Sequence, residues 1–299
     1  MKNFFAKIIG PGALLFPAWA YIVFFFVIPV AIIFFYSFGY KPDLFTPVAT
    51  DMLSLDQYQA AMSGTIYSTF LSTLQISITG TLICLVIAVP FAYWLAVKVS
   101  PRRRNLLLAL VLVPYWTNFL VRTLGWQITL APQGYLSDLL QATGLREGPL
   151  DILYTSVAVQ IGVVYNYLPL MILPLFVAMD AAGKHLREAS YDLGAGKWNT
   201  FSRITMPLAM PGVISGCLLV FVPLNGDYVT SAVLGGAQGT MIGQVIANQF
   251  NTAQDWALGS AMAVTLMLVT AIVVAVAGLV FWSGRKLYQR LTRVDLELA

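Results

Sequence analysis

The sequence carries very little charge. Asp, Glu, Lys and Arg make up only 10% of its 299 residues, whereas a soluble domain carries about 25%. Hydrophobic residues reach 59%, and the mean hydropathy is +0.78. Because so few charged side chains cannot cover a surface that faces water, the composition excludes an ordinary soluble domain. It predicts an integral membrane protein.

Cysteine and histidine are also scarce. Cys84 and Cys217 both fall inside apolar runs, where a thiol acts as a small apolar side chain more readily than as a disulfide or a metal ligand. The only histidine, His185, has no neighbouring cluster of Cys, Asp or Glu. A structural zinc site takes about four such ligands, so we expect no metal site in this chain.

A phosphate-binding loop is missing as well. The nearest match is Gly-Ala-Gly-Lys at residues 194–197, but the motif needs a glycine at position 191 and Ser or Thr after the lysine. Tyr191 and Trp198 stand there instead. We therefore expect no catalytic residue and no bound cofactor, and the energy for any ATP-driven process must come from a partner.

Long apolar runs dominate what is present. A helix needs about 20 apolar residues to cross a bilayer core, and continuous apolarity excludes barrel strands, which alternate over about ten residues. Lipid also leaves the backbone no partners outside a helix. We predict one all-α integral membrane domain over residues 1–299. Its six transmembrane helices cover approximately residues 14–38, 69–97, 105–124, 152–179, 206–224 and 258–282.

The segment 225–257, between the last two predicted spans, is moderately apolar but broken by glycines. Irregular backbone at membrane depth needs protein or water around it. We therefore expect a re-entrant or interfacial element that lines a cavity.

Basic residues indicate the orientation. With a cytoplasmic N-terminus, all but three of the 17 Lys and Arg residues fall in inside segments, beginning with Lys2 and Lys7. The three others are Lys41, Arg122 and Arg146. Because cytoplasmic loops carry an excess of Lys and Arg, we predict that both termini and the polar segment 180–206 are cytoplasmic.

This polar segment separates the fourth and fifth predicted spans. It contains a short helical pattern, a Gly194-Ala195-Gly196 break and a second short amphipathic run. One face of the first pattern holds Leu186, Ala189, Ser190 and Leu193. Two helices joined at a fixed glycine elbow suit docking against another protein, but a solvated connector between spans is the alternative. Spacing alone leaves both interpretations open.

Within the segment, Glu188-Ala189-Ser190, then Gly194 and Ile204-Thr205-Met206-Pro207 resemble the cytoplasmic signature of ABC-importer permeases. That pattern is Glu-Ala-Ala, three residues, Gly, nine residues, Ile-x-Leu-Pro; Ser190 and Met206 depart from it but keep its size and character. The resemblance implies the type I ABC importer permease (MetI-like) fold of six transmembrane helices with a cytoplasmic coupling helix. In that family the coupling helix sits in a groove on a separate ATPase subunit, which uses the ATP and Mg.

The resemblance also implies roles for single residues. Glu188 would orient the coupling helix or pair with a basic group on the ATPase, and Gly194 would permit the turn. Leu186 and Leu193 would fill the groove. The full predicted coupling set is Leu186, Glu188, Ala189, Ser190, Leu193, Gly194, Ile204 and Pro207. Nucleotide binding would then move the fifth span and drive alternating access.

Further motifs resemble spermidine/putrescine permeases. They are Pro114-Tyr115-Trp116-Thr117-Asn118 followed by Arg122, the stretch from Gly194-Ala195 to Pro211-Gly212, Leu234-Gly235-Gly236 with Met241-Ile242-Gly243, and Asp255-Trp256. The resemblance implies polyamine import across the bacterial inner (cytoplasmic) membrane. It implies two permeases, usually non-identical, two ATPase subunits and a periplasmic or lipid-anchored substrate-binding protein. Other organic cations, amino-acid derivatives, phosphonates, thiamine or iron are alternative substrates, because their permeases share much of this pattern.

A polyamine path requires carboxylates and aromatic faces, which stabilise desolvated ammonium groups. Asp227 lies at the outer end of the fifth predicted span, where an ionisable group is a functional candidate. It could instead be an interfacial acid or a partner for Arg122, which could also pair with Asp138 or snorkel outward. The other predicted path residues are Tyr115, Trp116, Asn118, Tyr165, Asn166, Tyr167 and Tyr228. These residues could equally form an aromatic interface belt or pack between helices.

Two other functional classes compete with import. A proton- or sodium-driven secondary carrier would have ionisable residues near mid-membrane and inverted repeats. Neither is evident, and such a carrier leaves the segment 180–206 unexplained. A membrane enzyme would need a nucleophile or an acid–base constellation near a bilayer surface, and the sequence offers none.

Overall fold

The computed structural model describes the backbone of residues 11–297 and the side chains of residues 15–284 and Lys286. Lys2 and Lys7, on which the orientation prediction draws, lie outside the described residues. Every element in the described part is helical apart from an isolated bridge between Tyr40 and Ala49, which confirms the all-α class. The chain forms two compact units, Met1–Tyr67 with Ile246–Ala271 and Ser68–Val245 with Ile272–Ala299.

Five described helices are long and apolar enough to cross a membrane, and they coincide with five of the predicted segments. They are Leu15–Tyr36, Gly64–Val97, Ser156–Ala181, Lys197–Asn225 and Trp256–Gly284. The other predicted span, 105–124, is divided in the structure. The pair Pro101–Trp116 and Phe119–Ala142 meets at 88°, and the number of spans becomes six if this bent pair counts as one.

Local side-chain chemistry accounts for the break between α6 (Pro101–Trp116) and α7 (Phe119–Leu130). The Thr117 hydroxyl donates to the Pro114 carbonyl at 2.6 Å. Asn118 then caps α7, because its side-chain oxygen accepts from the backbone N–H groups of Leu120 at 2.8 Å and Val121 at 3.4 Å. Asparagine is among the preferred N-cap residues. Hydropathy does not register such a cap, so it predicted one continuous span.

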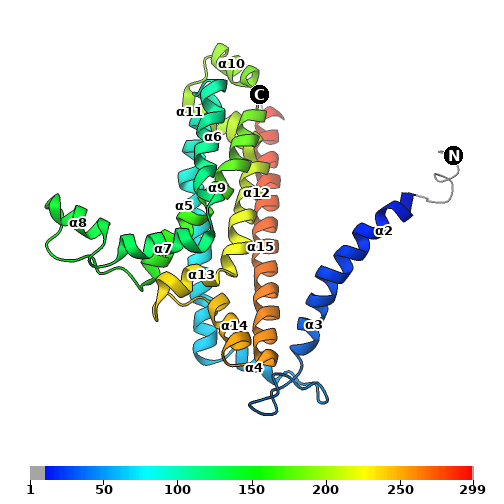
Figure 1. The fold of residues 1–299 in the computed structure, drawn as a ribbon. Helices are drawn as coiled ribbons and strands as arrows, with labels where there is room; N and C mark the ends of the chain where they lie inside the picture. Colours follow the sequence, from blue (N-terminus) through cyan, green and yellow to red (C-terminus); the bar gives the residue numbers. More distant parts are fainter. Residues whose placement is uncertain (1–10, 298–299) are drawn as a thin grey trace, which may run out of the picture. The chain divides into compact units, whose positions relative to one another are not determined.

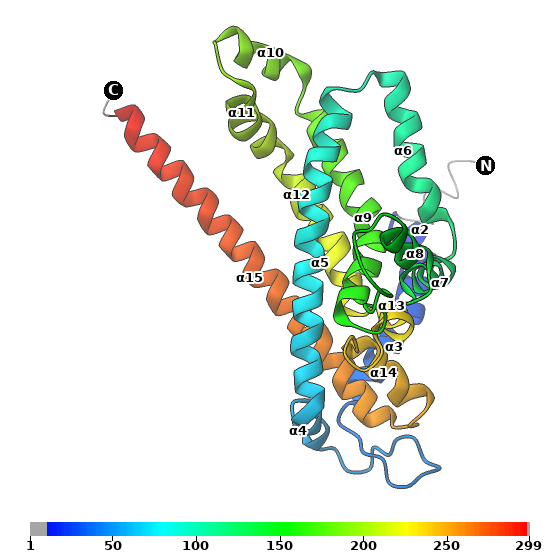
Figure 2. The ribbon, with the colours of Figure 1, turned by 90° about the vertical axis from the view of Figure 1, so that its left-hand side faces the viewer.

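The core of the larger unit lies between three helices that run side by side in both views (Figures 1 and 2): α5 (Gly64–Val97), α9 (Ser156–Ala181) and α12 (Met206–Asn225). Two glycines bring α12 close to α9. A Cβ on Gly212 would lie 2.5 Å from the Pro174 carbonyl oxygen, and one on Gly216 would lie 2.8 Å from the Met171 sulfur. Small residues permit such close approach in membrane helices, so α9 and α12 form one tightly packed pair.

The predicted re-entrant segment folds as α13 (Tyr228–Thr230), the π-helical turn η3 (Ser231–Gly235) and α14 (Ile242–Asn251). The Ser231 hydroxyl oxygen accepts from the Met241 N–H at 2.8 Å and closes the intervening loop. Gly162 of α9 lies against η3, since a Cβ there would be 2.5 Å from the Leu234 Cδ1. The irregular backbone therefore has protein packed against it, as membrane depth would require.

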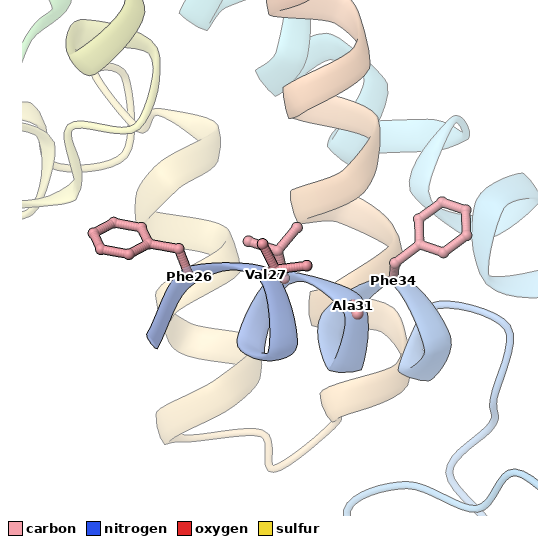
Figure 3. A pocket seen from close by; sticks show the side chains of 5 residues that line it. Phe26, Val27, Ala31 and Phe34 are labelled. Carbon is pink, nitrogen blue, oxygen red and sulfur yellow. The ribbon is translucent and has the colours of Figure 1, made fainter. Parts of the chain in front are cut away.

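The smaller unit contains α2 (Pro11–Ile22), the π-helical turn η1 (Val23–Val27), α3 (Ile28–Tyr36) and α4 (Asp56–Ala61), with the start of α15 (Trp256–Glu297). The Ser37 and Tyr58 hydroxyls lie 2.6 Å apart, and the Trp256 N–H donates to the Pro47 carbonyl at 3.0 Å. Figure 3 shows a hollow on the first helical segment, lined by Phe26, Val27, Val30, Ala31 and Phe34. Its lining is wholly apolar, which suits lipid or another apolar surface rather than a polar substrate.

Candidate functional site

The polar segment folds as α10 (Lys184–Asp192), a glycine turn, α11 (Lys197–Thr200) and the π-helical turn η2 (Phe201–Thr205), which leads into α12 (Figure 1). Gly194 has a φ of +81°, a conformation that glycine adopts without steric cost. Its N–H donates to the Tyr191 carbonyl at 2.9 Å, and the Ala195 N–H donates to the Ser190 carbonyl at 3.0 Å. These two bonds form a Schellman motif, so α10 ends at a defined elbow.

Three side-chain contacts lie within this segment or at the helix end beside it. The buried Arg187 donates from Nη1 to the Met179 carbonyl near the end of α9 at 3.4 Å. Asp180, also on α9, pairs with Arg104 of α6 at 2.6 Å. On the other side of the elbow, the Ser190 and Thr200 hydroxyls lie 3.0 Å apart and join α10 to α11. Arg187 therefore joins α10 to the end of α9, and Ser190 joins it to α11.

Two leucines are exposed among the charged residues of α10 and its C-cap. Leu186 is 52% exposed and Leu193 is 89% exposed. Beyond the elbow, Trp198 is also largely exposed, with its ring 5.7 Å from that of Phe201. Large apolar side chains that are exposed in a polar segment outside the membrane spans are typical of an interaction surface. Trp198 is absent from the predicted coupling set, although an aromatic residue in a polar segment was a usable signal.

The predicted coupling residues do not all share one environment. Glu188 pairs with Lys184 at 2.9 Å, and the hydrogen bond from Lys184 lowers the pKa of the Glu188 carboxyl, which keeps it ionised at neutral pH. Ser190 is buried and faces Thr200, whereas Ile204 is half-buried. The exposed members are Leu186, Glu188, Ala189, Leu193, Gly194 and Pro207.

Asp227 is one of three buried residues among the predicted path residues, with Asn166 and Tyr167. It is only 6% exposed. Its carboxylate accepts from the Thr230 N–H at 2.9 Å and from the Thr230 hydroxyl at 2.6 Å, which caps α13. The Tyr167 hydroxyl of α9 also lies near this carboxylate and interacts with it electrostatically. A carboxylate held this way at the end of α12 is screened from bulk water but hydrogen-bonded.

Aromatic rings extend from Asp227 to Arg122. The Tyr167 ring lies 6.2 Å from that of Phe119, and the Arg122 Cζ lies 5.5 Å from the Phe119 ring and 5.2 Å from the Tyr115 ring. We call Tyr115, Phe119, Arg122, Tyr167 and Asp227 the Asp227 cluster. It brings together three predicted path residues. Phe119 was not predicted, although it lies three residues before Arg122 and hence on the same helix face.

The other predicted path residues lie in other surroundings. Trp116 is 76% exposed at the end of α6, and Tyr228 is also exposed. Asn118 uses its side chain to cap α7. Tyr165 packs edge-on against Trp126 at 5.3 Å, and Asn166 donates to the Thr123 hydroxyl at 3.2 Å.

The alternative partners for Arg122 find no support in the geometry. Within the described part of the chain, the ion pairs are Arg104 with Asp180, and Lys184 and His185 with Glu188. Arg122 therefore pairs with neither Asp138 nor Asp227 there.

Comparison with known proteins identifies the family. The family described as binding-protein-dependent transport system inner membrane component matches residues 88–293. The chain is 41% identical over 246 residues to the spermidine/putrescine transport system permease protein PotB of Escherichia coli (strain K12), covering 82% of this chain and 87% of that protein. It is 40% identical over 226 residues to the protein of the same name from Haemophilus influenzae, covering 76% and 77% of the two chains.

A solved structure supports the fold. A bacterial alginate ABC transporter, in complex with an alginate pentasaccharide-bound periplasmic protein, matches with a TM-score of 0.70 at 16% identity. The match covers 89% of this chain and 91% of that one. The chain thus belongs to the binding-protein-dependent transport system inner membrane components, as a multi-pass permease subunit of an ABC importer that is not itself catalytic.

Proposed function

We propose that this chain is one of two permeases of an importer for spermidine and putrescine, and that it moves them by alternating access. The PotB relatives carry these substrates in their names. The observation that carries the proposal is the buried Asp227 carboxylate beside the Tyr167 hydroxyl. A desolvated ammonium group binds most strongly to a carboxylate and to aromatic faces, and the Asp227 cluster offers both.

The buried Asp227 carboxylate itself favours cations among the alternative substrates. A buried carboxylate repels a phosphonate, because like charges brought together at low dielectric raise the free energy of binding. Thiamine, other organic cations and iron carry the favoured sign, and they remain the second candidates. Their chemistry differs from that of polyamines in size and in the number of ammonium groups.

In this proposal the exposed face of α10 binds a partner ATPase. Leu186 and Leu193 are the groups that a groove on that subunit would bury. The Schellman elbow and the Arg187 anchor would pass the motion of α10 to α9 and α12. The close packing at Gly212 and Gly216 would then let these two helices move as one body. A solvated connector would not need exposed leucines.

The proposed assembly has this chain beside a second, non-identical permease, with two ATPase subunits and a periplasmic or lipid-anchored binding protein. Both termini and α10 would face the cytoplasm. The orientation is supported by Arg102, Arg103 and Arg104 near the start of α6, because cytoplasmic segments carry an excess of Lys and Arg. Arg104 pairs with Asp180 at the end of the unit where α10 lies.

Uptake of labelled spermidine by the complete transporter in vesicles tests the path. Asp227→Asn keeps an oxygen that can accept from the Thr230 N–H but removes the charge. The loss of one charge-assisted hydrogen bond, worth about 2 kcal/mol, lowers uptake about 30-fold. Asp138→Asn, at an exposed site on α8 (Tyr135–Ala142), is the matched control and should leave uptake unchanged.

Asp227→Ala separates the charge from the capping role, because it removes both. If capping alone matters, Asp227→Asn transports normally and only Asp227→Ala fails. Normal uptake by an assembled Asp227→Asn transporter would remove Asp227 from the substrate path.

A further inference from the structure

We propose that Arg122 is a resident cation of the substrate path. In the substrate-free permease its guanidinium covers the aromatic faces that a substrate ammonium must reach, and an entering substrate displaces it. The inference rests on the proposed function, since it takes the substrate to be a cation.

The position of Arg122 is the first argument. Its Cζ lies 5.2 Å from the Tyr115 ring and 5.5 Å from the Phe119 ring, within the range of a cation–π contact. Phe119 in turn packs against Tyr167. The Tyr167 hydroxyl interacts electrostatically with both Arg122 and Asp227. A tethered cation therefore already occupies the ring faces beside the carboxylate that would attract an ammonium group.

The weakness of this contact is the second argument. Nε and Nη1 of Arg122 are buried and have no hydrogen-bond partner among the described residues. A guanidinium presents five N–H donors, and a buried charge left unpaired is costly. Attraction to a ring is also weaker than a charge-assisted hydrogen bond. The guanidinium is thus held loosely enough to be replaced.

Arg104 shows what an anchored arginine looks like in the same chain. Its Cζ lies 5.5 Å from the Phe176 ring, a distance similar to those of Arg122. Unlike Arg122, however, it donates to a carboxylate, that of Asp180, at 2.6 Å. Arg104 is therefore held by an ion pair, whereas Arg122 is held by contacts with aromatic rings.

The resident cation has a consequence for substrate binding. With Arg122 in place, the positive charge of Arg122 offsets the negative charge of Asp227, so an incoming cation must exchange with Arg122 rather than fill an empty site. Removing the guanidinium should therefore tighten cation binding to the permease, and the gain should depend on Asp227.

Equilibrium dialysis of labelled spermidine against the purified permease–ATPase complex, without the binding protein, measures this directly. Arg122→Gln should bind spermidine about tenfold tighter than the unmodified complex, which corresponds to the loss of one competing cation–π contact. Adding Asp227→Asn should abolish that gain. Arg146→Gln, which removes an exposed arginine from another segment, should bind as the unmodified complex does.

Guanidinium chloride provides a second readout that a merely structural arginine would not affect. In Arg122→Ala the free ion can refill the vacated position, so low millimolar guanidinium should compete with spermidine. It should compete little in the unmodified complex. Arg122→Met keeps the apolar stem and serves in place of Arg122→Gln if that variant does not assemble.

Two results would overturn the inference while leaving the polyamine path in place. One is unchanged spermidine binding in Arg122→Gln when Asp227→Asn still impairs uptake. The other is a gain that persists in the double variant, as expected if Arg122 instead pairs with a carboxylate of the second permease. If no variant binds or transports spermidine, the proposed function itself fails.

Discussion

Replacing Gly194 by valine should abolish transport together with the ATP hydrolysis that is coupled to it. Gly194 has a φ of +81°, and a Cβ added there would meet nothing within 4 Å. Valine at this position therefore costs free energy through its backbone conformation and not through a steric clash. A β-branched residue held in the left-handed region loses about 1–2 kcal/mol. If the turn rearranges instead, the two Schellman bonds are lost, each worth about 1 kcal/mol. Both routes come to about 2 kcal/mol, or about 30-fold in the population of the native elbow.

Gly196→Val is the matched control. Gly196 lies two residues away, and it too has open space around a Cβ, but its φ is −70°. Valine fits that backbone, so Gly196→Val should preserve the elbow. Both variants should insert and assemble, because neither side chain enters the core.

The assay compares spermidine uptake with the ATP hydrolysis that a loaded binding protein stimulates, in vesicles containing the complete transporter. Gly194→Val should lose most of both activities, while Gly196→Val keeps them. If Gly194→Val retains normal uptake and normal stimulated ATP hydrolysis, the elbow does not transmit force. If both variants lose uptake and ATP hydrolysis equally, the size of the added side chain, and not the backbone conformation at residue 194, causes the loss. This result would refute the reasoning.

Two further substitutions test packing and docking. Gly212→Ala should lower the thermal midpoint of the purified complex, because its Cβ would lie 2.5 Å from the Pro174 carbonyl oxygen. Such overpacking lowers the free energy of unfolding by about 1–3 kcal/mol. Gly278→Ala, which has open space around its Cβ, should leave the midpoint unchanged. Leu193→Asp should weaken co-purification of the ATPase without loss of stability, whereas Leu145→Asp, at another largely exposed leucine, should not. An unaltered midpoint in the first case, or full ATPase recovery in the second, would contradict the account.

The sequence was sufficient for the class of fold. Hydropathy located five spans, because a run of about 20 apolar residues has few alternatives to a membrane helix. It also located the apolar stretch 105–124, but it gave no sign of the bend at the Asn118 cap, where this stretch divides into α6 and α7. A single hydrogen-bonding side chain changes the path of the backbone there while leaving the mean hydropathy almost untouched.

For the polar segment, the sequence indicated where the chain turns but not which side chains are buried. Glycine at position 194 indicated an elbow, and its positive φ has the geometry that such an elbow needs. Helical periodicity placed Ser190 on the same face as Leu186 and Leu193. In the structure Ser190 instead turns inward to Thr200, because the side-chain contact across the elbow depends on where α11 folds back. Short helices are stabilised mainly by tertiary packing, so this packing determines which of their side chains are buried.

The substrate path was the least predictable part. Tyr115, Tyr167 and Asp227 come from three separate segments, and only their packing shows that they meet. Tyr165 and Asn166 neighbour Tyr167 in the sequence but contact Trp126 and Thr123 instead, since residues next to each other on a helix point in different directions. The sequence left the partner of Arg122 open, and only the structure shows its contacts with the Tyr115 and Phe119 rings.

Cross-linking from position 193 in the assembled transporter tests the central claim most directly. Leu193→Cys, in a chain whose own Cys84 and Cys217 are replaced by alanine, places one thiol at the exposed C-cap of α10. The account predicts a cross-link to the ATPase subunit that changes in yield when nucleotide binds. Leu193→Cys that assembles, transports and yet never cross-links to the ATPase would contradict it.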